Sequence, residues 1–217
     1  MKIITLIISL GILFLANSQV KPHATITNAA YASYIDTVKN MPVYVTYKLY
    51  KGGGNCERSN KWINDSKYKM IGDESYAGSG YEKGHLANAE DFAYNCHLDS
   101  LTFNTYNRIP QTKALNRGIW KKQETLIRKM SQTDSLLITC GAYWDLNTIN
   151  SVKGMAIPSK CWKVVYSLST RQVLSSSIFT NSENPTEVPM TIENLELYLG
   201  YSINLPKQKS KNKSKKK

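Results

Sequence analysis

Tyr81-Glu82-Lys83-Gly84-His85-Leu86-Ala87 is the stretch that does most to define this chain, together with Asn116-Arg117-Gly118-Ile119-Trp120 and Glu124 further along. A phosphodiester resists attack because its non-bridging oxygens carry negative charge. Its hydrolysis therefore needs a base for water, a cation on the phosphate and a group near the leaving oxygen. A histidine, a metal-binding amide or carboxylate and a few basic side chains meet these needs. The pattern predicts a one-metal site for phosphodiester hydrolysis.

The segments around this pattern predict strands and two helices. Four segments have the alternation or the β-branched and aromatic content of strands, namely 43–49, 135–140, 162–168 and 173–179. Apolar side chains recur at helical spacing over 116–130, which predicts an amphipathic helix. A shorter helix is expected over 191–199, with Thr191 as its cap and Gly200 at its end.

Length and composition indicate one domain. With 217 residues, of which 41% are apolar, the chain can bury one substantial core. No internal repeat or linker divides it. The expected fold class is α+β, with a central, largely antiparallel sheet and flanking helices.

The first residues predict export. Residues 1–18 contain Lys2, then a mostly apolar run, and then small residues at the positions that a signal peptidase recognises. The alternative is a membrane anchor, but the run is shorter than the roughly 20 residues of a membrane span and no basic cluster follows it. We expect a cleaved signal peptide, a secreted or periplasmic protein and no stable membrane insertion.

The last residues, 206–217, contain seven lysines and no large apolar residue, which predicts a disordered tail after a folded domain of residues 19–205. The 28 basic residues of the chain include these seven and Lys2. The remaining 20 basic residues stand against 16 acidic ones, so the net charge falls from +12 to about +4. Such a tail attracts polyanions, including nucleic acid. The alternative is a solubilising tail without a partner.

Four cysteines, an even number in a chain expected to be exported, favour disulfides over thiols. No C-x-x-C spacing or nearby histidine pair suggests zinc. Four cysteines allow three connectivities. We favour Cys140 with Cys161, because they lie on successive predicted strands, and Cys56 with Cys96, because they bracket the candidate site.

Residues 81–92 are similar to the signature of the DNA/RNA non-specific endonucleases, the ββα-metal (His-Me finger) nucleases, in which an acidic residue, arginine, glycine and histidine follow one another. Residues 103–111 resemble the family segment in which an asparagine precedes a proline-glutamine pair. Residues 115–120 with Glu124 resemble its metal-binding helix. Three segments in the family's order make the resemblance specific, and weaker similarity covers the chain apart from its two ends. The resemblance implies a ββα-metal active-site motif.

The resemblance also implies roles for individual residues. His85 is expected to be the general base, since imidazole titrates near working pH. Asn116 is expected to be the sole protein ligand of a divalent ion, which favours Mg²⁺, with Mn²⁺ or another divalent cation as alternatives. Glu124 lies two helical turns beyond Asn116, on the same face, where it is expected to hold metal-bound waters.

Three further residues are expected to support the site. Arg58 resembles the family arginine that stabilises charge on the phosphate, with Lys61 as the alternative. Asn107 resembles a residue that arranges the site, although a turn residue before the following proline is an equal interpretation. Lys83 stands where most members have arginine, and lysine keeps the charge but loses the two-pronged phosphate contact.

Together these features predict a sugar-non-specific endonuclease that cleaves DNA and RNA and leaves 5′-phosphate ends. The first alternative is a non-catalytic protein that binds polyanions. A phosphodiesterase for small or lipid substrates is the second, but its expected cluster of histidine and aspartate ligands is absent from the sequence. The sequence does not indicate a preference between DNA and RNA, nor an oligomeric state.

Overall fold

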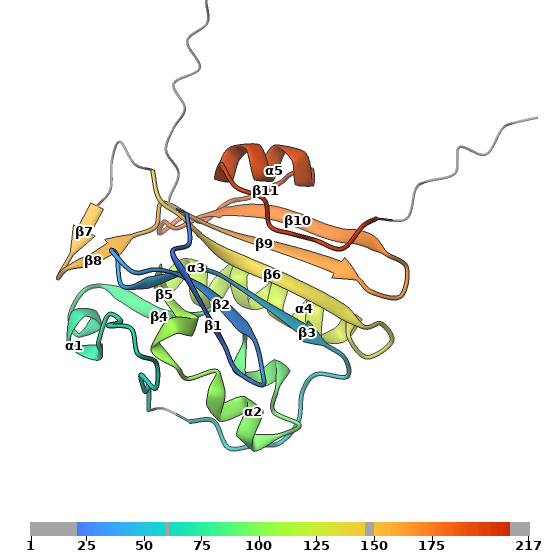
Figure 1. The fold of residues 1–217 in the computed structure, drawn as a ribbon, viewed down its shortest axis with the longest axis horizontal. Helices are drawn as coiled ribbons and strands as arrows, with labels where there is room; N and C mark the ends of the chain where they lie inside the picture. Colours follow the sequence, from blue (N-terminus) through green and yellow to red (C-terminus); the bar gives the residue numbers. More distant parts are fainter. Residues whose placement is uncertain (1–20, 60, 146–149, 209–217) are drawn as a thin grey trace, which may run out of the picture.

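The computed structural model describes residues 21–59, 61–145 and 150–208. Its main feature is a seven-stranded antiparallel sheet (Figure 1). In spatial order the strands are β1 (Ala24–Thr27), β2 (Ala32–Asp36), β3 (Met41–Leu49), β6 (Leu136–Tyr143), β9 (Lys160–Ser167), β10 (Gln172–Thr180) and β11 (Glu187–Pro189). The predicted signal peptide and residues 209–217 of the predicted tail lie outside the described residues.

The four predicted strands correspond to β3, β6, β9 and β10, and the predicted α+β class with a largely antiparallel sheet is confirmed. β3, β6 and β9 are buried along almost their whole length, so their apolar content is high and easily recognised. β1 and β11 are short edge strands without a buried residue. Their sequences therefore lack the pattern that would separate them from loops.

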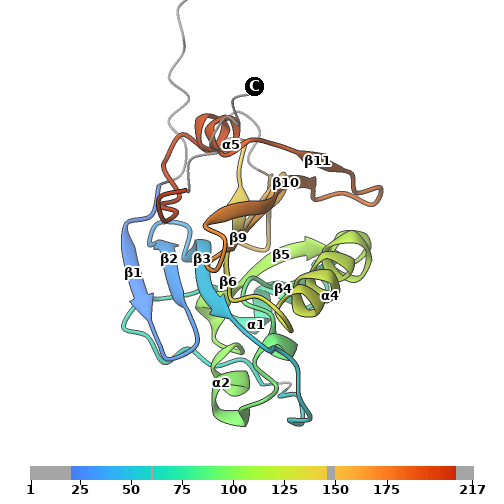
Figure 2. The ribbon, with the colours of Figure 1, turned by 90° about the vertical axis from the view of Figure 1, so that its right-hand side faces the viewer.

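The two faces of the sheet pack against different parts of the chain. Successive strand residues point to opposite faces, so Val45, Cys140 and Lys163, which pair across three strands, share one face. On this face Lys163 contacts Trp120, the residue directly before α4 (Lys121–Met130). The opposite face packs against α5 (Ile192–Leu199) and the residues after it (Figure 2). There the Tyr44 and Tyr201 rings stack with their centroids 5.7 Å apart.

α5 begins and ends as predicted. The Thr191 hydroxyl accepts a hydrogen bond from the Asn194 backbone nitrogen at 3.2 Å, and Gly200 ends the helix with a left-handed φ of 72°. Glycine adopts this conformation without the penalty that a β-carbon brings. None of the helices in the described part of the chain combines the length and apolar content needed to cross a bilayer.

A second, two-stranded sheet lies on the α4 side of the molecule and carries the signature stretch. It consists of β4 (Tyr81–His85) and β5 (Arg108–Thr112), paired so that His85 lies opposite Arg108. Short elements surround it, namely α1 (Asp73–Tyr76), η1 (Ala89–Asp91), α2 (Cys96–Leu101), η2 (Thr105–Asn107) and the hairpin of β7 (Asn150–Val152) and β8 (Met155–Ile157).

The helix predicted over 116–130 is present but interrupted. It consists of α3 (Lys113–Leu115), a π-helical turn η3 (Asn116–Trp120) and α4. The break falls at Gly118, whose φ of −95° and ψ of −114° are not helical. Glycine favours a helix interior less than other non-proline residues do, and π turns inside helices occur frequently at functional sites. The break lies two residues after Asn116.

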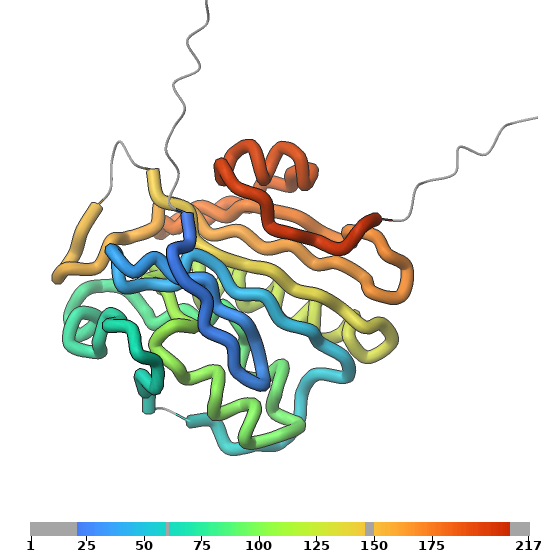
Figure 3. The backbone as a smooth tube through the Cα atoms, in the orientation of Figure 1, coloured from blue at the N-terminus to red at the C-terminus, as the bar shows by residue number. Residues whose placement is uncertain are grey.

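One of the two expected disulfides is present. Cys56 and Cys96 are bonded, which ties the segment between β3 and α1 to the start of α2. The backbone of both segments can be followed in Figure 3. The expected bond between Cys140 and Cys161 is wrong, because both are free, buried thiols. Cys140 pairs with Lys163 across the β6–β9 ladder, and Cys161 pairs with Ala142. The two cysteines are therefore diagonal neighbours, and diagonal neighbours lie roughly 7–8 Å apart, beyond the usual reach of a disulfide.

Candidate active site

His85 is the last residue of β4, and the glycine before it has a clear structural reason. Gly84 lies so close to the Gln111 side chain that a β-carbon there would stand 2.1 Å from Gln111 Oε1. Any larger residue would push β4 away from β5 or displace Gln111. Gly84 thus allows the close pairing that fixes the backbone of His85.

Asn107 fixes the backbone on the other side of His85. Its Oδ1 accepts from the Ala87 nitrogen at 2.8 Å, and its Nδ2 donates to the Ala87 and Thr102 carbonyls at 2.9 and 2.8 Å. The backbone carbonyl of Asn107 accepts from the Leu86 nitrogen. Asn107 is fully buried, so the structure places it as a support for the β4 exit rather than in the pocket beside His85.

The His85 ring is packed among aromatic and cationic side chains. The centroid of the His85 ring lies 4.5 Å from that of Trp62 and 4.8 Å from that of Phe103. The Arg58 guanidinium lies over the Phe103 ring. Burial, followed by the charges of Arg58 and Arg108, lowers the pKa of His85 to about 3. The imidazole is therefore neutral at physiological pH, as a base must be.

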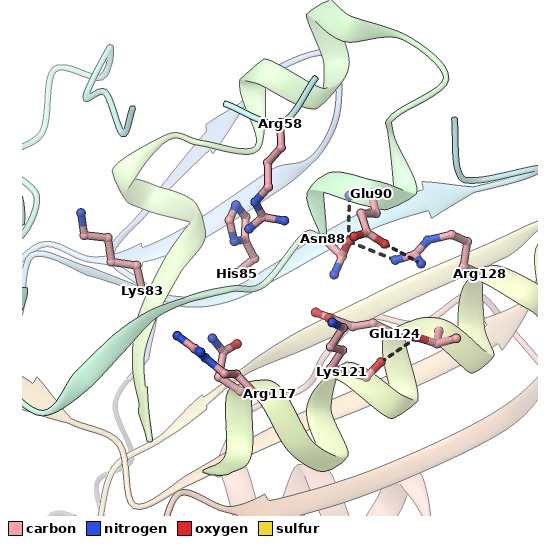
Figure 4. A pocket seen from close by; sticks show the side chains of 11 residues that line it. Arg58, Lys83, His85, Asn88, Glu90, Arg117, Lys121, Glu124 and Arg128 are labelled. Atoms are coloured by element: carbon pink, nitrogen blue, oxygen red, sulfur yellow. Dashed lines mark hydrogen bonds and ion pairs between the residues drawn. The ribbon is translucent and has the colours of Figure 1, made fainter. Parts of the chain in front are cut away.

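A pocket of about 350 Å³ lies beside His85 (Figure 4). Its charged lining is mainly cationic and consists of Arg58, Lys83, Arg117, Lys121 and Arg128, with the carboxylates of Glu90 and Glu124. His85 and Asn116 complete its chemically important lining. A mainly cationic pocket next to a neutral imidazole fits an anionic substrate that is attacked by water.

Asn116 is held in a defined orientation at the start of the π turn. Its Nδ2 donates to Glu82 Oε2 at 2.9 Å, while Arg117 pairs with Glu82 Oε1 at 2.5 Å. Burial opposes ionisation of Glu82, but the hydrogen bonds from Arg117 and Asn116 hold its pKa below the usual range. Because Glu82 engages the amide nitrogen, the amide oxygen of Asn116 is left for a ligand.

Glu124 lines the same pocket from the first turn of α4 and is 8% exposed. An amide oxygen and a carboxylate are the hard oxygen donors that Mg²⁺ prefers, so these residues fit a divalent ion. Among the described residues no group of three or more histidine, cysteine or acidic side chains could hold a metal. A metal here would therefore keep most of its coordination to water and substrate.

Lys83 lines the pocket but is also engaged elsewhere. Its ammonium pairs with Asp73 Oδ2 at 2.7 Å, and Arg108 pairs with the other oxygen of the same carboxylate at 2.5 Å. Figure 4 shows the Lys83 amine directed away from His85. Arg58, in contrast, extends towards His85 in the same view. Lys61, the alternative to Arg58, does not line this pocket.

Sequence reasoning did not single out Lys121 and Arg128. Together with Glu124 they occupy one face of α4 at spacings of three and four residues, a signal that helical periodicity could have provided. Arg128 is held by Glu90 at 2.9 Å and by Asp91 at 3.0 Å. The links from Glu82 to Asn116 and from Asp73 to Lys83 join distant segments and leave no such sequence signal.

The sequence model of the DNA/RNA non-specific endonucleases matches residues 15–208. The chain belongs to this family. A nuclease of Nostoc sp. is 29% identical over 147 residues, which are 64% of this chain and 53% of the relative. Mitochondrial endonuclease G of Bos taurus is 29% identical over 92 residues, 42% of this chain and 31% of the relative. Mitochondrial nuclease EXOG of Xenopus laevis is 33% identical over 103 residues, 45% of this chain and 29% of the relative.

The fold of this family member is also found in a solved structure. EndoG, in a complex of EndoG with EndoGI, superposes with a TM-score of 0.67 at 20% identity, covering 81% of this chain and 83% of that one. This likeness confirms the fold. The matched regions span about half or less of the length of the curated relatives. The family model therefore shows the family, and the activity of this chain has to be inferred from its own site.

Proposed function

We propose that this DNA/RNA non-specific endonuclease family member hydrolyses phosphodiester bonds within DNA and RNA. The observation that carries the proposal is the neutral, buried His85 beside a mainly cationic pocket that also holds Asn116 and Glu124. Family membership supports it. Low sequence selectivity is part of the proposal, because contacts to phosphates carry no base information.

The residues divide the chemistry as follows. His85 takes the proton from the attacking water, and the Arg58 guanidinium balances charge on the phosphate. Glu82 orients the Asn116 amide so that its oxygen, with Glu124 nearby, would hold one divalent ion. A bound Mg²⁺ would supply positive charge at the phosphate and at the departing 3′ oxygen. The products would carry 5′-phosphate and 3′-hydroxyl ends.

The test is a nicking assay on supercoiled plasmid and on single-stranded RNA, with magnesium and with EDTA. Both substrates should be cut with magnesium, EDTA should stop the reaction, and a ligase that requires 5′-phosphate should reseal nicked plasmid. A shift in mobility without cutting would favour a polyanion-binding protein instead. Products that cannot be ligated until a kinase adds a phosphate would contradict the proposed ends.

We further propose that the protein acts outside the cytoplasm, after removal of residues 1–18. The disulfide between Cys56 and Cys96 supports this, because structural disulfides persist in oxidising compartments. Cell fractionation with determination of the N-terminal residue of the purified protein tests it. A cytoplasmic protein that retains Met1 and has four reduced cysteines would exclude it.

A further inference from the structure

Lys163 is a buried cation that the proposed reaction does not use. It lies on β9 and is 3% exposed, and its Nζ has no hydrogen-bond partner among the described residues. Its ammonium lies 3.8 Å from the centre of the Trp120 ring. A charge removed from water without hydrogen bonds is strongly disfavoured, so neighbouring groups must favour its presence there.

The Trp120 contact links Lys163 to the candidate metal-binding turn. Trp120 is the last residue of η3, the turn that begins with Asn116, and it leads directly into α4 and Glu124. The Trp120 ring is fully buried and meets Phe179 edge-on at 5.6 Å. A cation on the face of a tryptophan is attracted by the ring, and more strongly when water is excluded. Lys163 on the sheet therefore supports the η3 turn through its contact with Trp120.

The Lys163 charge lies among several titratable and charged groups. The titratable and charged groups around it come from five elements and are Tyr47 on β3, Asp91 on η1, Glu124 and Arg128 on α4, Cys140 on β6 and Cys161 on β9 itself. Burial raises the pKa of both thiols to about 12, so they are uncharged at neutral pH. The carboxylate on which the Lys163 charge acts is that of Asp91.

The pKa of Asp91 depends on the charges around it. Burial and, to a smaller extent, the Glu124 charge raise its pKa to about 6 against the opposing charges of Arg128 and Lys163. Asp91 also accepts from the Tyr47 hydroxyl at 2.9 Å and pairs with Arg128. Removing the Lys163 charge would take away one of the two cations that oppose the rise in the Asp91 pKa. Asp91 would then be expected to take up a proton at a higher pH.

We propose that Lys163 is a positioning residue of the active site, whose buried ammonium holds the Asn116 turn through Trp120 and offsets the charge of the buried Asp91 carboxylate. Its effect on cleavage rests on the proposed nuclease function. Its effect on the buried charges does not, since it is a property of the folded protein without substrate or metal.

The first experiment measures the stability of metal-free protein. Lys163→Met keeps the length of the side chain and removes the charge, so the Asp91 carboxyl should have a higher pKa in the folded variant. Stability tied to a raised carboxyl pKa is present at low pH and is lost as the pH rises through that pKa. The melting temperature of the variant relative to wild type should therefore be at least about 3 °C lower at pH 8 than at pH 5. Lys163→Arg should remove most of this difference.

The second experiment measures cleavage of plasmid with magnesium. Lys163→Met should lower kcat/KM at pH 7 by about 10- to 100-fold, as is typical when a group that orients a metal site is lost. Part of the loss should be regained at pH 9, where the Asp91 carboxyl ionises again. Lys160→Met is the matched control. Lys160 lies on the same strand with its ammonium 5.5 Å from the Tyr143 and Tyr198 rings, and it does not line the pocket.

Three outcomes would overturn the proposal. They are wild-type behaviour of Lys163→Met, a loss of stability that is equal at pH 5 and pH 8, and a failure of Lys163→Arg to restore either property. If Lys163→Met does not fold, the double variant with Asp91→Asn removes one charge of each sign and should be more stable at pH 8 than the single variant. No such gain would also overturn it. A wild-type protein that cuts nothing would contradict the nuclease function, while the stability measurement would still decide the role of Lys163.

Discussion

At the scale of single residues, the site depends on groups whose protonation the fold has set. His85 is neutral because burial and the nearby arginines disfavour its imidazolium form. Asn116 is oriented by Glu82, and Glu82 stays ionised because Arg117 and Asn116 both donate to it. His85 and Asn116 could be selected from the sequence because their segments resemble a family signature. The role of Glu82 as a support for Asn116 could not, because it depends on a hydrogen bond between β4 and a helix far along the chain.

His85→Ala should abolish nicking while the protein still folds and binds nucleic acid. The lost group activates water, and loss of a general base costs about 100- to 10,000-fold in rate. Gel assays of nicking and of mobility shift on the same preparation provide the measurement. Turnover above roughly a tenth of wild type would mean that His85 is not the base.

His85 should also make the folded protein sensitive to acid. Its folded pKa of about 3 lies below the ordinary value of about 6.5, so its contribution to stability is present above pH 6.5 and is lost as the pH falls towards 3. Over that window wild type should lose up to about 1.4 kcal/mol per pH unit relative to His85→Gln, which cannot titrate. Urea unfolding of both proteins at pH 7, 6 and 5 measures this. Parallel pH profiles would contradict the low pKa of His85.

At the scale of elements, the sequence predicts what depends on local patterns and misses what depends on pairing. The central strands and both helices follow from burial and periodicity. The sequence does not show that Cys140 and Cys161 are free thiols. A register of β6 and β9 shifted by two residues would place them directly opposite each other, where a disulfide could form. Likewise the break at Gly118, which shapes the Asn116 turn, does not disturb the helical spacing of the apolar residues.

Variants in η3 and in α4 should differ in how their cleavage activity depends on magnesium. Asn116→Ala removes the expected ligand and should lose activity at any magnesium concentration. Glu124→Ala should be partly rescued by more magnesium, since loss of a group that holds metal-bound waters typically costs about 10- to 100-fold in affinity. Magnesium titrations of plasmid cleavage by both variants distinguish them, with Leu126→Ala, an exposed residue of the same helix outside the pocket lining, as a control. Full activity of wild type in EDTA would overturn the metal mechanism.

At the scale of the whole molecule, positive charge is distributed unevenly. Of the five cations around the pocket, Lys83, Arg117 and Arg128 are already paired with carboxylates. The local attraction for phosphate is therefore moderated. Six of the seven lysines in the predicted tail lie beyond residue 208, and the Tyr166 hydroxyl donates to the Lys207 carbonyl at 3.1 Å. A truncation that tests the tail should therefore end after residue 208 and leave this hydrogen bond intact.

Truncation after residue 208 should weaken binding to long DNA at low salt and spare cleavage of short oligonucleotides. Lysines that neutralise phosphates act by releasing counterions, which depends steeply on salt and does not require a fixed geometry. The slope of log K against log salt should become shallower by about 0.9 for each duplex phosphate that the tail no longer neutralises. A full-length variant with the six lysines changed to glutamine controls for length and should match the truncation. If all three proteins have the same slope, the tail does not bind DNA, and its lysines serve solubility instead.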